Sequence, residues 1–463
     1  MDWEILLNIV NGLILAGWLL VSLKLRRIYS VVPGALLVLH VAATGGLGAA
    51  SEEFGAGTVL YGQVLLLIAN VILATTCTLL DRHLVPKARL QDVGRWLREP
   101  SASKRRYFAA IAVLTALVVG LQIRGGIARL GIGWEEARET QDAIDSVAIF
   151  LSFIAFPSAW VAFRSRMYIT ATILATLSLA IFQVMGSRAI LLTLVTIVYA
   201  ELLLSGLSLR RKLATVLLLA VCGLGLHTAA RLTRGIGLVG VLELAGSLRI
   251  TDLVQSDAID FTGGEGNIYR YYYYVVQKSY EHYPYRAWTT AQRLALLYVP
   301  TRWAPDIKPA DITYTLYLDA FDDGVFDNNP YLEKIGMLVA EGQTGSIQPT
   351  LWGEAYANGG LIAILVVPVL LGVILVAIEK YLRALTPVGV VLIVPVTMVG
   401  YLMVARGNSV IGFGYLGYAI PMIAVAAWFG RLKLLRKRIL NLGSSTLQTS
   451  RLSDTGTAHS GAP

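Results

Sequence analysis

Charged residues and cysteines are scarce in this sequence. Only 15% of its 463 residues are charged and 56% are hydrophobic, with a mean hydropathy of +0.63; these values lie outside the range of soluble globular chains. The two cysteines, Cys77 and Cys222, are far apart and each lies in an apolar run, which indicates buried thiols and no disulfide framework. The composition therefore predicts a polytopic membrane protein.

Motifs of nucleotide and metal chemistry are also missing. The sequence has no Walker loop, no Asp-x-Asp, no H-E-x-x-H and no Cys/His cluster, so nothing in it points to a metal or another cofactor. The stretch GFGYLG, Gly412 to Gly417, lies inside an apolar run and predicts close helix packing, not a nucleotide site. The net charge of +9 is explained by Lys and Arg that flank apolar runs, so nucleic acid is not an expected partner.

Eleven apolar runs have about the length that a bilayer-crossing helix needs. They cover 4–23, 29–47, 58–80, 107–123, 147–163, 167–185, 189–208, 213–230, 357–378, 387–405 and 409–429. We therefore predict an all-α, polytopic membrane helix bundle with one large loop between its eighth and ninth helices. Its expected parts are an N-terminal bundle (1–230), the large loop with interfacial helices (231–356), a C-terminal bundle (357–440) and a disordered polar tail (441–463).

Basic residues set the expected orientation of this bundle. One side of the membrane collects most of them: Lys24, Arg26, Arg27, the loop 82–106, Arg164, Arg166, the segment 210–212, Lys380, Arg383 and the cluster 431–438. The positive-inside rule makes that side cytoplasmic. The N-terminus and the large loop are then predicted outside and the C-terminus inside, with the first span retained because it lacks a cleavage signal.

Charged residues are also expected together at the outer side. They are Arg188 in MGSRAI, Arg231 and Arg234 in HTAARLTRG, Glu354 in LWGEAYANGG and Arg406 in VARGNS. Taken singly, each is explained as an interfacial anchor, but arginine in short outer loops runs against the positive-inside rule. Together they favour an anionic partner at headgroup depth, such as a pyrophosphate-linked lipid, because guanidinium groups pair with phosphate oxygens.

Two stretches of the large loop add candidates. Tyrosines crowd GGEGNIYRYYYYVVQKSYEHYPYR, which indicates either a helix lying in the membrane interface or contact with sugar rings, for which Tyr272 is the candidate. The stretch PTRWAPDIKPAD holds Arg302, Trp303 and Lys308 between prolines that restrict the backbone. This stiff segment can present cations and an aromatic face to a lipid-linked sugar.

The topology and three patches, GSRAILL, YVPTRWAPDIKPAD and SIQPTLWGEAYANGGLIA, resemble the bacterial O-antigen polymerases, the Wzy-type oligosaccharide repeat-unit polymerases. The resemblance implies a glycosyltransferase-C-like enzyme of the bacterial cytoplasmic (inner) membrane. Such an enzyme polymerises undecaprenyl-pyrophosphate-linked repeat units into O-antigen, capsule or exopolysaccharide chains on the outer side. Its implied partners are a lipid-linked donor and acceptor within the bilayer. A chain-length regulator and a flippase are further candidate partners.

The same resemblance assigns residues. The family arginine of the mid-chain hairpin falls on Arg188, the lysine-proline pair of the loop on Lys308 and Pro309, and the glutamate of the closing motif on Glu354. The related O-antigen ligases carry a histidine ahead of this motif, where the present chain has Ser346 and Gln348. The Arg-x10-Gly pattern of some polymerase loops is absent from the large loop.

A mechanism follows as a hypothesis. Negative charge builds on the leaving pyrophosphate, and preorganised cations stabilise such charge. The expected cations are Arg188, Arg231 and Arg234, assisted by Arg302, Lys308 or Arg406. Glu354 is the first candidate for the general base at the acceptor hydroxyl, with His282, Asp306 or Asp311 in reserve. The alternative for Glu354 is a charge that stabilises a helix N-terminus.

Three other classes of protein stay open at this point. An O-antigen ligase would pass the glycan to a lipid A core. A flippase or transporter would use charged residues within the membrane as a substrate pathway. A scaffold or chain-length regulator would need no arginines that converge at headgroup depth.

Overall fold

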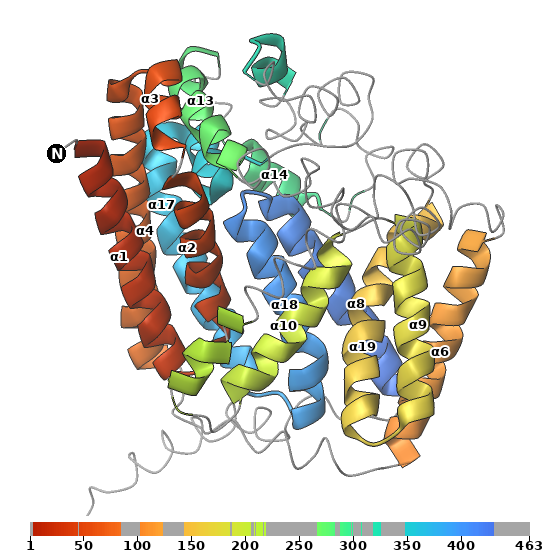
Figure 1. Ribbon diagram of the computed structural model, residues 1–463. Helices are drawn as coiled ribbons and strands as arrows, with labels where there is room; N and C mark the ends of the chain where they lie inside the picture. The colour runs from red at the N-terminus through yellow and green to blue at the C-terminus, as the bar shows by residue number, and fades with distance from the viewer. Residues whose placement is uncertain are drawn as a thin grey trace, which may run out of the picture.

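The computed structural model describes residues 3–44, 46–84, 102–123, 143–185, 188–204, 266–282, 288–297, 318–325 and 348–429, together with 208, 210–215, 217–218, 299 and 307. Within these ranges the regular elements are helices (Figure 1). They are α1 (Trp3–Lys24), η1 (Ile28–Ser30), α2 (Val31–Thr44), α3 (Leu47–Phe54), α4 (Ala56–Leu84), α6 (Ala102–Ile123), α8 (Ala143–Arg164), α9 (Tyr168–Met185), α10 (Arg188–Leu204), α13 (Gly266–His282), α14 (Thr289–Ala295), α17 (Thr350–Leu382), α18 (Pro387–Ala405) and α19 (Ser409–Phe429).

Four of these helices are long and apolar enough to cross a membrane: Trp3–Lys24, Ala56–His83, Ala102–Gln122 and Thr350–Leu382. Shorter apolar helices cover Ile28–Val41, Leu151–Arg164, Tyr168–Ile181 and Leu392–Ala405. Large apolar side chains point outward from the bundle, as Leu13 and Ile169 do at 68% and 80% exposure, which water would disfavour and lipid tolerates. The structure is therefore that of a membrane-embedded helical protein. The number of eleven spans stays a prediction, because residues beyond 218 in the expected eighth span lie outside the described ranges.

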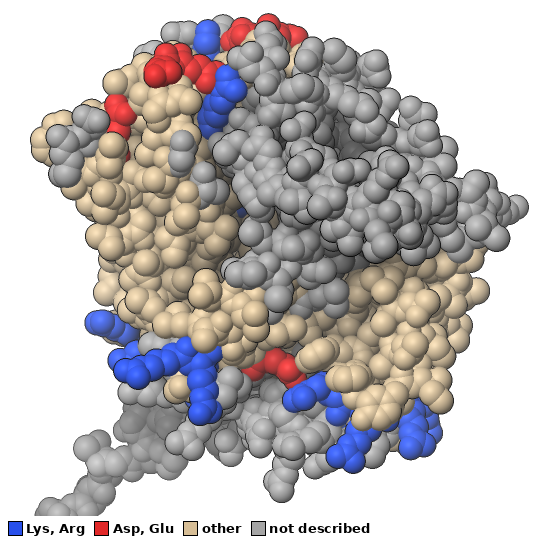
Figure 2. Space-filling view, in the orientation of Figure 1, with Lys and Arg blue, Asp and Glu red and all other residues tan. Residues whose placement is uncertain are grey.

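The bundle has two chemically different ends (Figure 2). We call the lower end in Figures 1 and 2 the basic end, because exposed lysine and arginine side chains gather there. Helices α1, α4, α8 and α17 finish at this end, and α6 begins there. Its exposed cations include Lys24, Arg82, Arg105, Arg164, Arg166, Arg211 and Lys380. The opposite end, here the acidic end, carries Glu4, Glu52, Glu53, Asp319, Asp322 and Asp323. This asymmetry is the one expected from the basic residues of the sequence.

Small residues allow the closest helix contacts. A Cβ added to Gly412 of α19 would lie 2.7 Å from the carbonyl oxygen of Gly400 in α18, so the prediction that GFGYLG packs helices together is confirmed for Gly412. In the same way, a Cβ on Gly372 of α17 would lie 2.7 Å from the side chain of Thr76 in α4. Such approaches pack helices tightly where hydrophobic burial does not drive association.

Buried charges join helices at the basic end. Arg27 donates to Asp81 Oδ2 of α4, with Nη2 at 2.6 Å, and Arg383 donates from Nε to Glu379 Oε1 of α17 at 2.9 Å. The other oxygen of Glu379 accepts the backbone N–H of Ile28 at 2.8 Å. Asp81 and Glu379 thus each have a cation beside them, which is the condition for tolerating such charges inside a protein.

Candidate functional site

Helix α17 is broken close to the acidic end. Its backbone leaves helical geometry at Gly359 (φ −166°, ψ 24°) and Gly360 (φ 56°, ψ −142°), the second a conformation that glycine adopts readily. The first segment, Thr350 to Asn358, consists of buried residues, whereas several apolar side chains after the break are exposed. Broken helices whose ends lie inside protein are a recurrent way to build polar sites at membrane depth. The sequence prediction began this helix near residue 357, but it begins at Thr350, because the stretch TLWGEAYAN is itself helical.

Glu354 ties the first segment of α17 to the start of α19. Its Oε2 accepts the backbone N–H of Ser409 at 3.1 Å and the Ser409 hydroxyl at 2.8 Å, and Glu354 is only 3% exposed. A carboxylate at a helix N-terminus is stabilised by free N–H groups and by the helix dipole. The helix that Glu354 stabilises in this way is α19, whereas the sequence alternative placed the charge at the start of its own helix.

The turn between α18 and α19 presses on the start of α17. A Cβ on Gly407 would lie 2.3 Å from the carbonyl oxygen of Thr350, so this contact requires glycine. Gly407 has φ +89° and Thr350 has φ +70°. A positive φ is a strained conformation for a β-branched residue such as Thr350. Arg406 precedes this turn as the C-cap of α18. The structure therefore brings Arg406 to the same junction as Glu354.

Tyr272 is placed differently from its expected role. It is fully buried, its hydroxyl donates to the Gly62 carbonyl at 2.8 Å, and its ring lies 3.1 Å from where a Cβ on Gly353 would stand. Burial, together with the neighbouring Tyr273, raises the pKa of Tyr272 well above its ordinary value, so the hydroxyl stays a donor. Tyr269, Tyr271, Tyr273 and Tyr274 are buried as well.

The expectation that this tyrosine run faces a glycan or the membrane interface is therefore corrected. Helix α13 packs against α17, α4, α2 and α3, and the run fills that contact. Arg270 pairs with both oxygens of Glu53 in α3, which attaches a helix of the expected large loop to the acidic end of the bundle. The Tyr274 hydroxyl donates to Asp323, a residue of the same large loop.

A buried polar network, which was not predicted from the sequence, lies beneath the junction. Trp352 donates from Nε1 to Asn70 Oδ1 at 2.9 Å, and Asn70 is 3.4 Å from Asn11 Oδ1. Asn11 donates to the side chain of Gln63 at 3.1 Å, and Gln63 donates to the Tyr273 hydroxyl at 2.6 Å. The network joins α17, α4, α1 and α13, and the signal for it was the presence of Asn and Gln inside apolar runs.

Of the other candidate site residues, only Arg188 and His282 lie within the described residues. Arg188 is the first residue of α10, which descends from the acidic end towards the basic end (Figure 1). His282 is the last residue of α13. Arg231, Arg234, Arg302, Trp303 and Lys308 lie outside the described residues.

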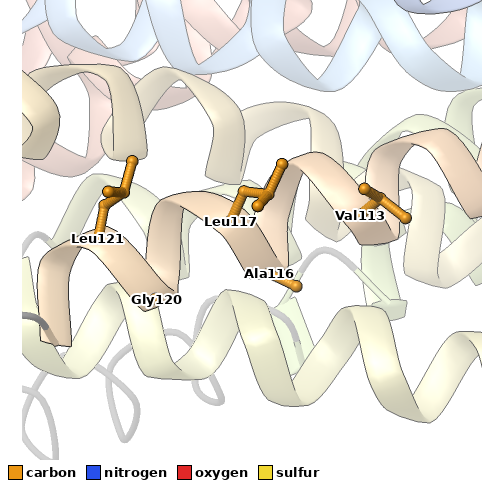
Figure 3. Close-up of a pocket in the computed structure, with 5 residues that line it drawn as sticks. All are labelled: Val113, Ala116, Leu117, Gly120 and Leu121. Carbon is orange, nitrogen blue, oxygen red and sulfur yellow. The ribbon is translucent and has the colours of Figure 1, made fainter.

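Two observations elsewhere in the described residues add no catalytic or binding group to the site. Among the described residues, no three His, Cys, Asp or Glu side chains are arranged to hold a metal ion. A shallow groove of about 430 Å³ is lined by Val113, Ala116, Leu117, Gly120 and Leu121 of α6, and Leu117 and Leu121 point to the same side of that helix (Figure 3). Its lining offers no polar side chain.

No family model, no curated protein and no solved structure matches this chain. Its function is therefore inferred from the residues and from their geometry.

Proposed function

We propose that the chain is a membrane glycosyltransferase that polymerises polyprenyl-pyrophosphate-linked repeat units, as the Wzy-type O-antigen polymerases do. The observation that carries the proposal is the junction at the acidic end, where a buried carboxylate on a broken helix, Glu354, is oriented by Ser409 beside the Arg406 turn. A base oriented by a third group is the arrangement that proton transfer requires. Loop helices α13 and α14 pack at the same end.

The proposed setting is the bacterial cytoplasmic membrane, with eleven spans, the N-terminus outside and the C-terminus inside. The basic end then faces the cytoplasm, in agreement with the positive-inside rule, and the acidic end faces the side where lipid-linked repeat units are joined. The described helices of the large loop, α13 and α14, lie at the acidic end. This orientation places Glu354, Arg406 and the start of α10 at Arg188 on the outer side.

In the proposed reaction, a hydroxyl of the acceptor glycan attacks the anomeric carbon of the donor glycan. The bond from that carbon to the pyrophosphate oxygen breaks, polyprenyl pyrophosphate leaves with the electron pair, and Glu354 takes the proton of the hydroxyl. Cations stabilise the leaving charge; Arg188 and Arg406 are the candidates at this end, and Arg231, Arg234, Arg302 and Lys308 are proposed to join them. Trp303 is proposed to stack on a sugar, and His282 is the reserve base.

Burial of Glu354 adds a condition to this reaction. At 3% exposure its carboxylate meets a substrate only when an element that covers the first segment of α17 moves, while Ser409 keeps the carboxylate in place.

The test compares envelope polysaccharide from a deletion strain complemented with wild type, Glu354→Gln or Glu52→Gln. Glu52 is the matched control, because it is an exposed glutamate at the same end. We expect wild type and Glu52→Gln to restore a ladder of chain lengths, and Glu354→Gln, at equal protein level, to leave single repeat units. A normal ladder from Glu354→Gln would overturn its assignment as the base.

A transport function is the second candidate, because a broken helix that starts inside the protein is also found at transporter sites. The same strains distinguish it. A flippase defect would leave lipid-linked repeat units on the cytoplasmic side, a ligase defect would accumulate lipid-linked polymer, and a polymerase defect would leave single units on the outer side.

A further inference from the structure

Helix α14 is attached to α17 through one residue, Asn358. The carbonyl oxygen of Asn358 accepts the backbone N–H of Trp288 at 3.0 Å. Its Oδ1 accepts the Thr290 N–H at 2.9 Å and the Thr289 hydroxyl at 3.1 Å, and its Nδ2 donates to the Thr290 hydroxyl at 2.8 Å. Four hydrogen bonds therefore join one asparagine to three consecutive residues of the large loop.

The same side chain also holds the segment that carries Glu354. Its Nδ2 donates a second hydrogen bond, at 2.7 Å, to the carbonyl oxygen of Glu354. Both amide hydrogens and both acceptor positions of Asn358 are thus used, and the residue is only 4% exposed. Asn358 directly precedes the break at Gly359 and Gly360, so it sits where the first segment of α17 would turn.

Backbone strain marks this joint. Trp288, the N-cap of α14, has φ +67° and ψ +27°, a left-handed conformation that is unfavourable for a non-glycine residue. Its ring lies 3.8 Å from the position of a Cβ on Gly359. Such strain persists only where the surroundings over-determine the conformation, and it gathers at functional sites.

The far end of α14 reaches a third element. The Leu297 side chain lies 3.8 Å from the position of a Cβ on Gly414 in α19. Helix α19 is also the helix whose first residue, Ser409, holds the Glu354 carboxylate. Each of the helices α14, α17 and α19 therefore contacts the other two, and Glu354 lies where α17 meets α19.

We propose that Asn358 is a positioning residue that links docking of α14 to the placement of Glu354. When α14 is docked, Asn358 fixes the segment that keeps the carboxylate on Ser409. When α14 is released, the segment turns at Gly359 and Gly360 and Glu354 leaves Ser409. The inference rests on the proposed function, because it makes the large loop the element that sets the catalytic carboxylate.

Hydrogen exchange tests the link without any assay of activity. The Ser409 amide donates to Glu354 and belongs to α19, whereas Asn358 belongs to α17, so this amide reports on Glu354 from a different helix. In Asn358→Ala we expect the amides of Thr290 and Ser409 to exchange about tenfold faster than in wild type, the effect of losing one or two buried hydrogen bonds. Unchanged exchange at Ser409 would overturn the inference.

Asn8→Ala is the matched control, since Asn8 is also 4% exposed and donates to Thr44 within the N-terminal helices. We expect it to leave exchange at Ser409 unchanged. Equal acceleration of Ser409 exchange in Asn8→Ala and Asn358→Ala would mean that either substitution loosens the bundle as a whole, and it would overturn the proposal.

Two milder variants keep the test open if Asn358→Ala does not fold. Asn358→Asp retains the acceptor for the Thr289 hydroxyl and the Thr290 N–H but loses both donated hydrogen bonds, to the Glu354 carbonyl and to the Thr290 hydroxyl. It is expected to preserve protection at Thr290 and to lose it at Ser409. Thr290→Val removes one hydroxyl from the joint and is expected to accelerate hydrogen exchange of the Thr290 and Ser409 amides by a smaller factor. If neither variant accelerates exchange at either amide, the link is overturned.

Kinetics separate this inference from the proposed function. Purified protein is supplied with lipid-linked repeat units extracted from the deletion strain. We expect Asn358→Ala to lower kcat about tenfold with little change in KM, and to add little more in the Glu354→Gln background, since both act on one carboxylate. If wild type forms no polymer, the proposed function fails while the exchange result stands. If wild type polymerises and Asn358→Ala keeps its kcat, the inference fails alone.

Discussion

Replacing Gly407 with alanine should loosen the junction that holds Glu354. The new Cβ would stand 2.3 Å from the carbonyl oxygen and 2.4 Å from the carbonyl carbon of Thr350, whereas ordinary contact begins near 3.4 Å. Because both atoms belong to the backbone, no side-chain rotation relieves the overlap. The start of α17 and the turn before α19 must therefore separate by roughly 1 Å.

That separation removes identifiable interactions. At least one of the two hydrogen bonds from Ser409 to Glu354, at 2.8 and 3.1 Å, would lengthen beyond the usual limit. Loss of one hydrogen bond to a charged group costs about 1.5–3 kcal/mol, and the positive φ of Gly407 adds about 1–2 kcal/mol for alanine. We expect Gly407→Ala to lower the free energy of unfolding by about 2.5–5 kcal/mol.

Gly48→Ala is the control for the change from glycine to alanine. Gly48 lies in α3, its φ is not positive, and a Cβ added there would meet nothing within 4 Å, so its replacement carries neither overlap nor backbone strain. Thermal melting in detergent should leave Gly48→Ala close to wild type and clearly above Gly407→Ala. Equal melting of the two variants would refute the reasoning, because the contact with Thr350 would then contribute nothing.

Three further substitutions test other parts of the packing, each by thermal melting. Gly412→Leu should separate α18 from α19 at Gly400 and destabilise by about 1–3 kcal/mol; wild-type melting would contradict the close contact. Arg27→Leu leaves Asp81 buried without its cation and should cost about 3–5 kcal/mol, whereas a smaller loss would mean that water reaches the carboxylate. Trp352→Phe removes the indole hydrogen bond to α4 and should cost about 1–3 kcal/mol, and no loss would mean that the network is dispensable.

The sequence predicts helix positions well where the chain carries both apolar runs and end signals. The predicted runs 387–405 and 409–429 coincide with α18 and α19. At one end Thr386 caps α18 by accepting the Gly389 N–H and Pro387 is the first helical residue, and at the other end Gly407 and Asn408 turn the chain. The run 29–47 is less regular than predicted. The structure divides it into a 3-10 turn, η1, and α2, and hydropathy does not carry that distinction.

The site was harder to predict because it depends on contacts between distant segments. Glu354 and Arg406 were expected together, and the structure places the Glu354 carboxylate on Ser409, three residues after Arg406. Tyr272 was placed wrongly because a tyrosine run reads as amphipathic, and only the packing of α13 on α4 and α17 shows that it is core. Asn358 and Ser409 were missed, although an asparagine directly before two glycines is a signal of a helix end.

The most direct measurement is polymerisation in proteoliposomes that contain only this protein and lipid-linked repeat units from the deletion strain. We predict a ladder of glycan lengths with release of polyprenyl pyrophosphate from wild type and from Glu52→Gln, and at least about a hundredfold slower ladder formation from Glu354→Gln. Repeat units that remain single with wild type, or a ladder that forms equally fast with Glu354→Gln, would contradict the claim that this junction joins glycans.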